Sequence, residues 1–244
     1  MIDSNHGLVA LTFDFWGTLY ENAYARDDRL RVLDDALRRH NQPRSWKEID
    51  AAYSHARSVW DRVWREEQRS IPIERWLDEL LGSLGAELPD EAEVRLGRAI
   101  EEIYLRGCDP RPVEGVSEVL PALAERYALG LISDTGLTPG RVLRQVMRRD
   151  HLLSFFDALT FSDELGIAKP KPEPFLHTLH ELGARPGEAA HIGDLPETDL
   201  RGARRVGMKV ILFLGVSERE DGRKLADAVF QHYDELEGVL ERRL

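Results

Sequence analysis

Short apolar runs that end in polar residues recur along the chain and predict buried strands. The first run covers residues 8–13, and later runs cover 128–132, 158–161, 189–192 and 209–214. Short, continuous apolar stretches are typical of strands that are buried on both faces of a parallel sheet. The segments between the later runs have helical spacing, over 116–127, 139–149, 175–182 and 200–206. This alternation predicts parallel βα units with right-handed crossovers.

The segment from about residue 21 to 106 contains no strand-like run. Its apolar residues form two stripes with steps of three and four: Leu30, Leu33 and Leu37, then Ile49, Tyr53, Ala56, Trp60 and Trp64. Such steps are typical of amphipathic helices. Pro72 and Pro89 each stand near a helix start, and residues 94–105 form a further helical segment. We therefore expect an all-helical insertion over residues 21–110, between core segments 1–20 and 111–244.

Polar residues follow the predicted strands. Asp14-Phe15-Trp16-Gly17-Thr18 ends the first run, Ser133 ends the second, and Lys169-Pro170 follows the third. Asp194 and Asp199 follow the fourth run, in Gly-Asp-Leu-Pro-Glu-Thr-Asp. In an open α/β sheet the carboxyl ends of the strands meet at one edge, where ligands bind. We expect carboxylates, a hydroxyl and an ammonium to converge there.

This constellation resembles the haloacid dehalogenase superfamily of hydrolases, over residues 8 to about 214. The resemblance implies an α/β fold, with a Rossmann-like parallel three-layer core and an inserted all-helical cap domain. It also implies that Asp14 is a nucleophile that forms an aspartyl-phosphate, while Ser133 and Lys169 hold the phosphoryl group. Each residue taken alone has an ordinary structural interpretation, such as turn capping or a solvated charge. The four motifs in order favour catalysis.

The resemblance further implies a Mg²⁺ site. Asp14, the backbone carbonyl of Trp16 and Asp194 would ligate the ion, and Asp199 would act through water. Oxygen ligands of this kind suit Mg²⁺. Thr18 is expected to order the loop or contact the substrate. Asp134, beside Ser133, is expected to cap a turn or contact the substrate.

One position departs from the phosphatases of the superfamily. Most of them carry a second Asp two residues after the nucleophile, where this chain has Trp16. The indole cannot exchange a proton with a leaving group, and loss of a general acid costs about 10²–10⁴ in rate. The 2-haloacid dehalogenases have an aromatic residue there, and they expel a halide that needs no acid.

Three functions stay open on these residues. The retained Asp194 and Asp199 favour a Mg²⁺-dependent phosphatase of small phosphorylated metabolites, because the dehalogenases work without metal. Asp134 also stands where those dehalogenases carry Asn. The first alternative is a metal-independent 2-haloacid dehalogenase. The second, kept open by Trp16, is a weakly catalytic or non-catalytic ligand-binding protein.

Composition narrows the expected partners and location. The 244 residues carry a net charge of -11, from 33 basic and 44 acidic side chains, without a basic run. That balance disfavours nucleic-acid binding. A single cysteine excludes an intramolecular disulfide and fits a cytoplasmic location. No apolar run has the length of a membrane span, and residues 8–13 are too short for a signal peptide. The oligomeric state is left open.

Overall fold

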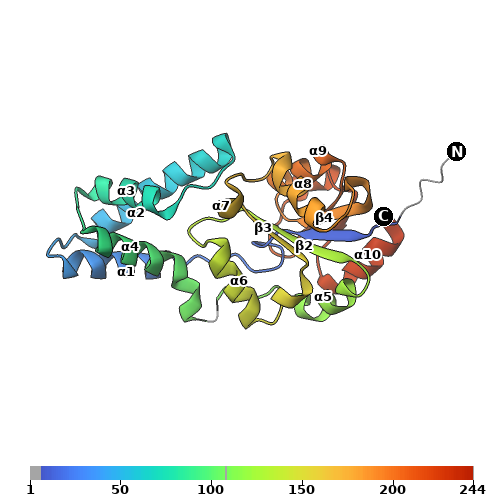
Figure 1. Ribbon diagram of the computed structural model, residues 1–244, viewed down its shortest axis with the longest axis horizontal. Helices are drawn as coiled ribbons and strands as arrows, with labels where there is room; N and C mark the ends of the chain where they lie inside the picture. The colour runs from blue at the N-terminus through green and yellow to red at the C-terminus, as the bar shows by residue number, and fades with distance from the viewer. Residues whose placement is uncertain (1–6, 108, 244) are drawn as a thin grey trace.

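The computed structural model describes residues 7–107 and 109–243, so Cys108 lies outside the described residues. Its centre is a parallel sheet in the order β3-β2-β1-β4-β5-β6 (Figure 1). The strands are β1 (Ala10–Phe13), β2 (Ala128–Ser133), β3 (Ala158–Phe161), β4 (Ala189–Gly193), β5 (Lys209–Phe213) and β6 (Ala228–Phe230). The predicted α/β fold with a parallel, three-layer core is confirmed.

Helices cover both faces of the sheet, with α8 and α9 on one side and α5, α6 and α10 on the other (Figure 1). Their bounds are α5 (Val116–Ala124), α6 (Gly140–Arg149), α7 (Ser162–Leu165), α8 (Pro172–Glu181), α9 (Arg201–Val206) and α10 (Leu236–Arg243). Every residue of β1 is therefore buried, as expected for a central parallel strand. The strand β6 and helix α10 lie beyond the last predicted run.

The order of the strands reverses beside β1. The chain passes from β1 to β2 and β3 on one side, then returns to place β4, β5 and β6 on the other side. Phe13 at the end of β1 is in register with Leu131 of β2 and Ile192 of β4. A crevice forms at the carboxyl ends of strands where such an order reverses. Asp14 and Asp194 follow the two strands that flank this point.

Residues 26–106, which we call the helical unit, extend from one end of the sheet (Figure 1). The unit contains α1 (Arg26–Arg39), α2 (Trp46–Arg62), a π-helical turn (Val63–Glu67), α3 (Ile73–Leu84), α4 (Asp90–Glu101) and a 3-10 turn (Glu102–Arg106). Its helices bury an apolar cluster of their own around Leu33, Ile49 and Trp76. Helix α4 begins at Asp90 rather than at residue 94, because Pro89 and the acidic first turn favour a helix start there.

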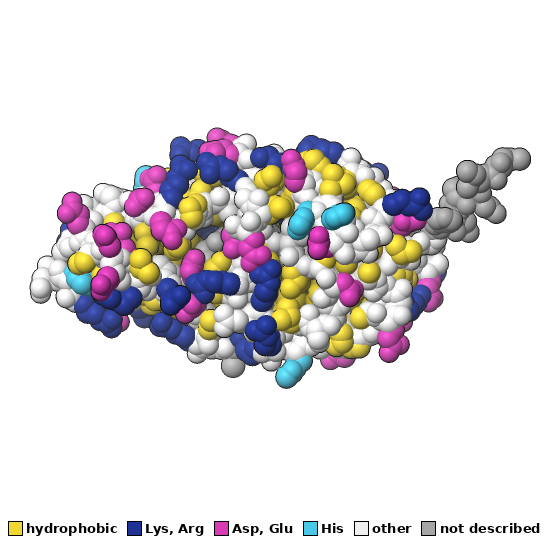
Figure 2. Space-filling view, viewed as in Figure 1, with side chains coloured by type: hydrophobic (Ala, Val, Ile, Leu, Met, Phe, Trp, Pro, Cys, Tyr) yellow, Lys and Arg dark blue, Asp and Glu magenta, His cyan; other side chains and the backbone are white. Residues whose placement is uncertain are grey.

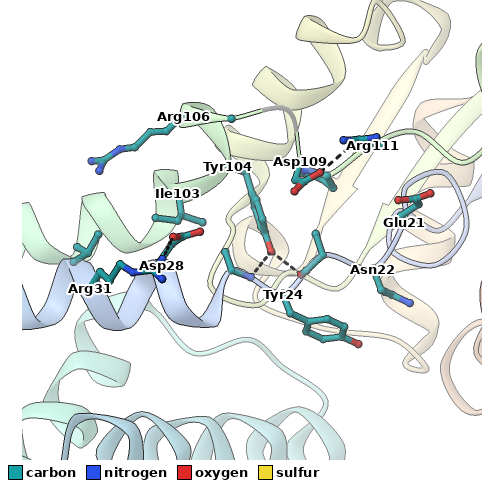
Figure 3. Close-up of a pocket in the computed structure, with 15 residues that line it drawn as sticks. Glu21, Asn22, Tyr24, Asp28, Arg31, Ile103, Tyr104, Arg106, Asp109 and Arg111 are labelled. Atoms are coloured by element: carbon teal, nitrogen blue, oxygen red, sulfur yellow. Dashed lines mark hydrogen bonds and ion pairs between the residues drawn. The ribbon is translucent and has the colours of Figure 1, made fainter. Parts of the chain in front are cut away.

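Two short connections join the helical unit to the sheet. The Tyr104 hydroxyl donates to the Ala23 carbonyl (2.6 Å) and accepts from the Ala25 amide (3.3 Å), which ties the connections together (Figure 3). A cavity of about 650 Å³ lies beside them. Its charged side chains form local ion pairs, such as Arg31 with Asp28 (2.7 Å). None of the expected site residues lines this cavity.

Charges of both signs are interspersed on the face of the molecule seen in Figure 2. That face carries no extended basic surface of the kind that tracks a nucleic-acid backbone. Within residues 7–107 and 109–243, no helix combines the length and the apolar character needed to cross a membrane.

Candidate active site

A buried cluster of charges lies at the carboxyl ends of β1 and β4. The Lys169 ammonium donates to Asp14 Oδ1 (2.5 Å), to Asp199 Oδ1 (2.6 Å) and to the Ile132 carbonyl (3.0 Å). Lys169 is only 2% exposed, and both carboxylates are buried as well. Asp14 Oδ2 accepts no hydrogen bond from any described residue. The cluster thus fixes one oxygen of Asp14 and leaves the other free for chemistry.

The pKa values of Asp14 and Asp199 are shifted in opposite directions. Burial raises the pKa of Asp14, and the nearby charges of Asp199 and Asp194 raise it further, against the effect of Lys169. The pKa of Asp199 is held below its ordinary value because Lys169 and His191 outweigh its burial. The pKa of Lys169 is raised by Asp14 and Asp199, which outweigh burial, so the ammonium stays charged. Asp199 therefore stays ionised and is the counter-ion of Lys169.

Three buried carboxylates could hold a cation. Asp14, Asp194 and Asp199 each offer an oxygen within 4.8 Å of the others. Asp194 Oδ2 accepts from the Ser217 hydroxyl (2.8 Å), but Asp194 Oδ1 is buried without a hydrogen-bond partner. A buried carboxylate oxygen without a partner is costly. The donor set is all oxygen and fits a hard cation such as Mg²⁺.

The first loop approaches Asp194 closely. Gly17 has a φ of 69°, and a Cβ atom there would collide with the Asp194 carboxylate. Only glycine adopts this conformation at low cost and leaves that space open. The loop that carries Asp14 and Trp16 therefore lies against the carboxylate that follows β4.

Two further hydroxyls near the cluster are buried without partners. Ser133 Oγ, at the end of β2, and Thr18 Oγ1 are both buried, and neither forms a hydrogen bond with a described residue. The structure places Ser133 one residue after Ile132, whose carbonyl accepts from Lys169. Neither side chain lines the cavity at the strand ends. The structure therefore leaves both hydroxyls with unused hydrogen-bonding capacity but does not bring either of them into the cavity.

The cavity at the strand ends measures about 390 Å³. Asp14, Trp16, Lys169 and Asp194 line it. The Trp16 ring packs edge-on against Phe15 (4.8 Å between centroids) and lies 5.9 Å from the Tyr104 ring of the helical unit. The indole therefore occupies the wall between the sheet and the helical unit, where it supplies apolar surface and no acid.

Asp134 links the helical unit to the site. Its Oδ2 accepts from the Trp64 indole N–H (3.0 Å) and its Oδ1 accepts from the Lys169 amide (2.9 Å). The Gln68 carbonyl accepts from the Ala168 amide (2.8 Å) one residue away. Both carboxylate oxygens of Asp134 thus hold segments in place, and the helical unit is docked over the cavity.

Sequence reasoning missed three residues that support the cluster. His191 Nε2 lies 3.4 Å from Asp199 Oδ1, and its Nδ1 lies 2.8 Å from the Thr12 hydroxyl. Burial lowers the pKa of His191, so the ring is neutral. Ser217 binds Asp194, and the Tyr233 hydroxyl donates to the Thr18 carbonyl (2.9 Å). The sequence did carry a signal for His191, because a histidine inside the apolar run 189–192 is unusual.

The chain is similar in sequence to known phosphatases and in structure to a dehalogenase. Glyceraldehyde 3-phosphate phosphatase of Methanopyrus kandleri is 26% identical over 210 residues, 84% of this chain and 83% of the relative. Phosphoserine phosphatase of Thermus thermophilus is 33% identical over 114 residues, 47% of this chain and 45% of the relative. The solved structure of 2-haloacid dehalogenase from Pseudomonas syringae superposes with a TM-score of 0.72 at 26% identity, covering 96% of this chain and 99% of that one.

The comparison with protein families identifies the family of this chain. The model of the haloacid dehalogenase-like hydrolases matches residues 8–207, which include Asp14, Ser133, Lys169, Asp194 and Asp199. The match thus spans most of the sheet and the whole helical unit. This chain belongs to the haloacid dehalogenase-like hydrolase family.

Proposed function

We propose that this hydrolase is a cytoplasmic, Mg²⁺-dependent phosphatase of small phosphorylated metabolites that acts through an aspartyl-phosphate on Asp14. The contact that carries the proposal is Lys169 Nζ to Asp14 Oδ1 (2.5 Å), beside the buried, unpartnered Asp194 Oδ1. Phosphoryl transfer requires a nucleophile and nearby positive charge. Here a carboxylate supplies the nucleophile, a fixed ammonium supplies positive charge, and an unpartnered carboxylate oxygen can ligate a metal ion. The phosphatase names of curated relatives support the same class.

In the proposed reaction, Asp14 Oδ2 attacks phosphorus, and the ester P–O bond breaks as the aspartyl-phosphate forms. The leaving group departs as an oxyanion that takes its proton from water. Water then attacks the phosphorus, which releases inorganic phosphate and restores the carboxylate. Lys169, held by Asp199, would neutralise charge on the transferring group. Ser133 and Thr18 would donate to phosphoryl oxygens. Bound Mg²⁺, held by Asp14, Asp194 and the Trp16 carbonyl, would supply charge neutralisation of the phosphoryl oxygens.

We also propose that residues 21–110 act as a cap domain on the core formed by 1–20 and 111–244. The Trp64–Asp134 hydrogen bond and the Gln68–Ala168 contact support this assignment, because they seat the helical unit over the cavity. Closure of such a cap would exclude bulk water from the aspartyl-phosphate. In this arrangement Asp134 positions the cap and the Lys169 backbone, and it reaches substrate only at the cavity wall.

A second candidate function has its own support. The similarity to a 2-haloacid dehalogenase structure and the aromatic Trp16 favour attack by Asp14 on carbon, with halide as leaving group. The test measures release of p-nitrophenol from p-nitrophenyl phosphate with Mg²⁺, and release of chloride from chloroacetate with EDTA. We expect the first reaction and not the second. Chloride release in EDTA without phosphatase activity would establish the dehalogenase, and inactivity in both would favour a binding protein.

The rate should depend steeply on the pKa of the leaving group, because Trp16 supplies no acid. Aryl and acyl phosphates should be hydrolysed much faster than alkyl phosphates. Trp16→Asp should raise the rate on alkyl phosphates by at most the ~10²–10⁴ that a general acid contributes. The measurement is kcat/KM across a series of phosphate esters of increasing leaving-group pKa.

Trp16→Asn is the matched control for this prediction. It removes the same indole contacts with Phe15 and Tyr104 but brings no acid, so it should not raise the rate on alkyl phosphates. A flat dependence on leaving-group pKa in the parent enzyme, with chemistry rate-limiting, would contradict the prediction. Another residue would then donate the proton, and Asp134→Asn would be the first variant to examine.

A further inference from the structure

A further cavity of about 200 Å³, which we call the second cavity, lies next to the active-site cavity, between the helical unit and the core beyond Trp16. It shares Trp16, Asn22, Tyr24 and Asp134 with the cavity that contains Asp14, so the two adjoin each other. Six of its fourteen lining residues are aromatic: Trp16, Tyr24, Tyr53, Trp60, Trp76 and Tyr104. A phosphate ester bound at Asp14 would extend its organic part past Trp16 into this space.

Arg29 from helix α1 lines this second cavity, with a side chain that is largely buried. The residue is 8% exposed. Its Nε donates to the Ile100 carbonyl (3.3 Å) and its Nη2 donates to the Thr138 hydroxyl (3.0 Å). The guanidinium carbon lies 5.4 Å from the centre of the Tyr104 ring. Within the described part of the chain, Arg29 forms no ion pair with a carboxylate.

A buried guanidinium without a carboxylate partner is unusual, because removal of a charge from water is costly unless the charge is paired. The carbonyl at the end of α4 and the Tyr104 ring compensate part of the positive charge. Both of the oxygens that accept from Arg29 belong to neutral groups. The positive charge of Arg29 is therefore only partly compensated within the protein, and a bound anion would supply the missing negative charge.

The other polar groups in this wall also favour an anion. The Trp60 indole N–H is buried and has no hydrogen-bond partner among the described residues. Arg57 also lines the cavity, but it is half-exposed and paired with Asp61 (4.0 Å), so it adds little to the site. The single carboxylate in the lining, Asp134, already accepts from Trp64 and from the Lys169 amide. Arg29, without a carboxylate partner, and the unpartnered Trp60 N–H are therefore the groups in this cavity that a bound anion would satisfy.

We propose that the second cavity is a carboxylate subsite, and that Arg29 and the Trp60 indole N–H bind a carboxylate on the organic part of the substrate. The proposal rests on the proposed phosphatase function, and it names the substrate class as small phosphorylated carboxylic acids. Arginine suits this task because its planar donors match a carboxylate. The aromatic walls would contact the carbon chain between the two anionic groups.

The test compares ligands that cannot be hydrolysed and differ by one group. Phosphonoacetate is paired with ethylphosphonate, and 3-phosphonopropionate with propylphosphonate, each titrated calorimetrically into the Mg²⁺-loaded protein. In at least one pair the carboxylate should bind about 10- to 100-fold more tightly, the range for a charged hydrogen bond in a buried site. Arg29→Gln should reduce that ratio to near one.

Two control variants separate binding from structure. Arg31→Gln removes an exposed cation from the same helix and should keep the carboxylate preference. Thr138→Val removes the hydroxyl that accepts from Arg29 but leaves its charge, so a preference should persist. If Arg29→Gln does not fold, Arg29→Lys retains the charge without the planar donors, and it should show a reduced preference.

Three results would overturn the subsite. They are a ratio near one in the wild-type protein for both pairs, a preference that survives Arg29→Gln, and no binding of either carboxylate at millimolar concentration. Failure of the proposed function would be recognised separately, as no hydrolysis of p-nitrophenyl phosphate by the wild-type protein with Mg²⁺. An active phosphatase without a carboxylate preference would reject the subsite alone.

Discussion

Replacement of Asp14 by asparagine should lower the turnover of an aryl phosphate by about 10⁴-fold or more, as expected when a nucleophile is lost. The amide is not a nucleophile toward phosphorus, yet its oxygen can still accept a hydrogen bond from Lys169. Lys169 also keeps its contact with Asp199 (2.6 Å), so the cation remains paired in the variant. The measurement is steady-state hydrolysis of p-nitrophenyl phosphate, with thermal unfolding to check the fold.

Asp78→Asn is a suitable control for this variant, because Asp78 is exposed on α3. It should keep wild-type turnover and stability.

Lys169 is a less informative target than Asp14. Its removal would leave the buried Asp14 and Asp199 carboxylates without their cation, and breaking a buried ion pair costs about 3–5 kcal/mol of stability. An Asp14→Asn protein with near wild-type turnover would exclude Asp14 from the mechanism.

Asp194→Asn should weaken Mg²⁺ binding strongly. Loss of a residue that only supports a metal ligand typically costs about 10–100-fold in affinity, and loss of Asp194 should cost more. The reason is that Asp194 Oδ1 is the buried carboxylate oxygen without a protein partner. Activity should fall with the loss of bound metal, and excess EDTA should abolish the activity of the wild-type enzyme. The measurement is a calorimetric Mg²⁺ titration of both proteins.

The same titration carries a dependence on pH. Burial and the charge of Asp199 raise the pKa of Asp194 to about 7. Because a protonated carboxyl is a poor ligand, the Mg²⁺ affinity of the wild-type protein should decrease as the pH falls below that value and level off above it. Asp194→Asn should make this dependence shallower. Unchanged affinity in the variant would contradict the assignment of Asp194 as a ligand.

The strands that were predicted are the ones with a clear physical signal. Runs such as 158–161 and 189–192 are apolar throughout because helices cover both faces of the sheet, and they coincide closely with β3 and β4. The strand β6 is only Ala228–Phe230. So short an apolar stretch does not differ from the surrounding sequence, and its place is fixed by pairing with β5. Edge strands of this kind depend on tertiary contacts.

Some residues of the site can likewise be predicted from local sequence, while others depend on tertiary packing. The carboxylates Asp14 and Asp194 were accessible because each directly follows an apolar run, and strand direction alone brings such positions together. Arg29 was not accessible, because its helix carries several arginines that look alike in sequence. Arg31 is exposed two residues away, while Arg29 is buried against Ile100 and Thr138. Only the packing of α1 against α4 and the core distinguishes the two.

The proposed function depends above all on transfer of a phosphoryl group to Asp14. The most direct measurement is mass spectrometry of the protein after acid quenching during turnover of an aryl phosphate with Mg²⁺. We predict a phosphoryl adduct on the peptide that contains Asp14, which is removed by hydroxylamine and absent in excess EDTA. Rapid phosphate release with no adduct on Asp14 at any quench time, or an adduct on a different residue, would contradict it.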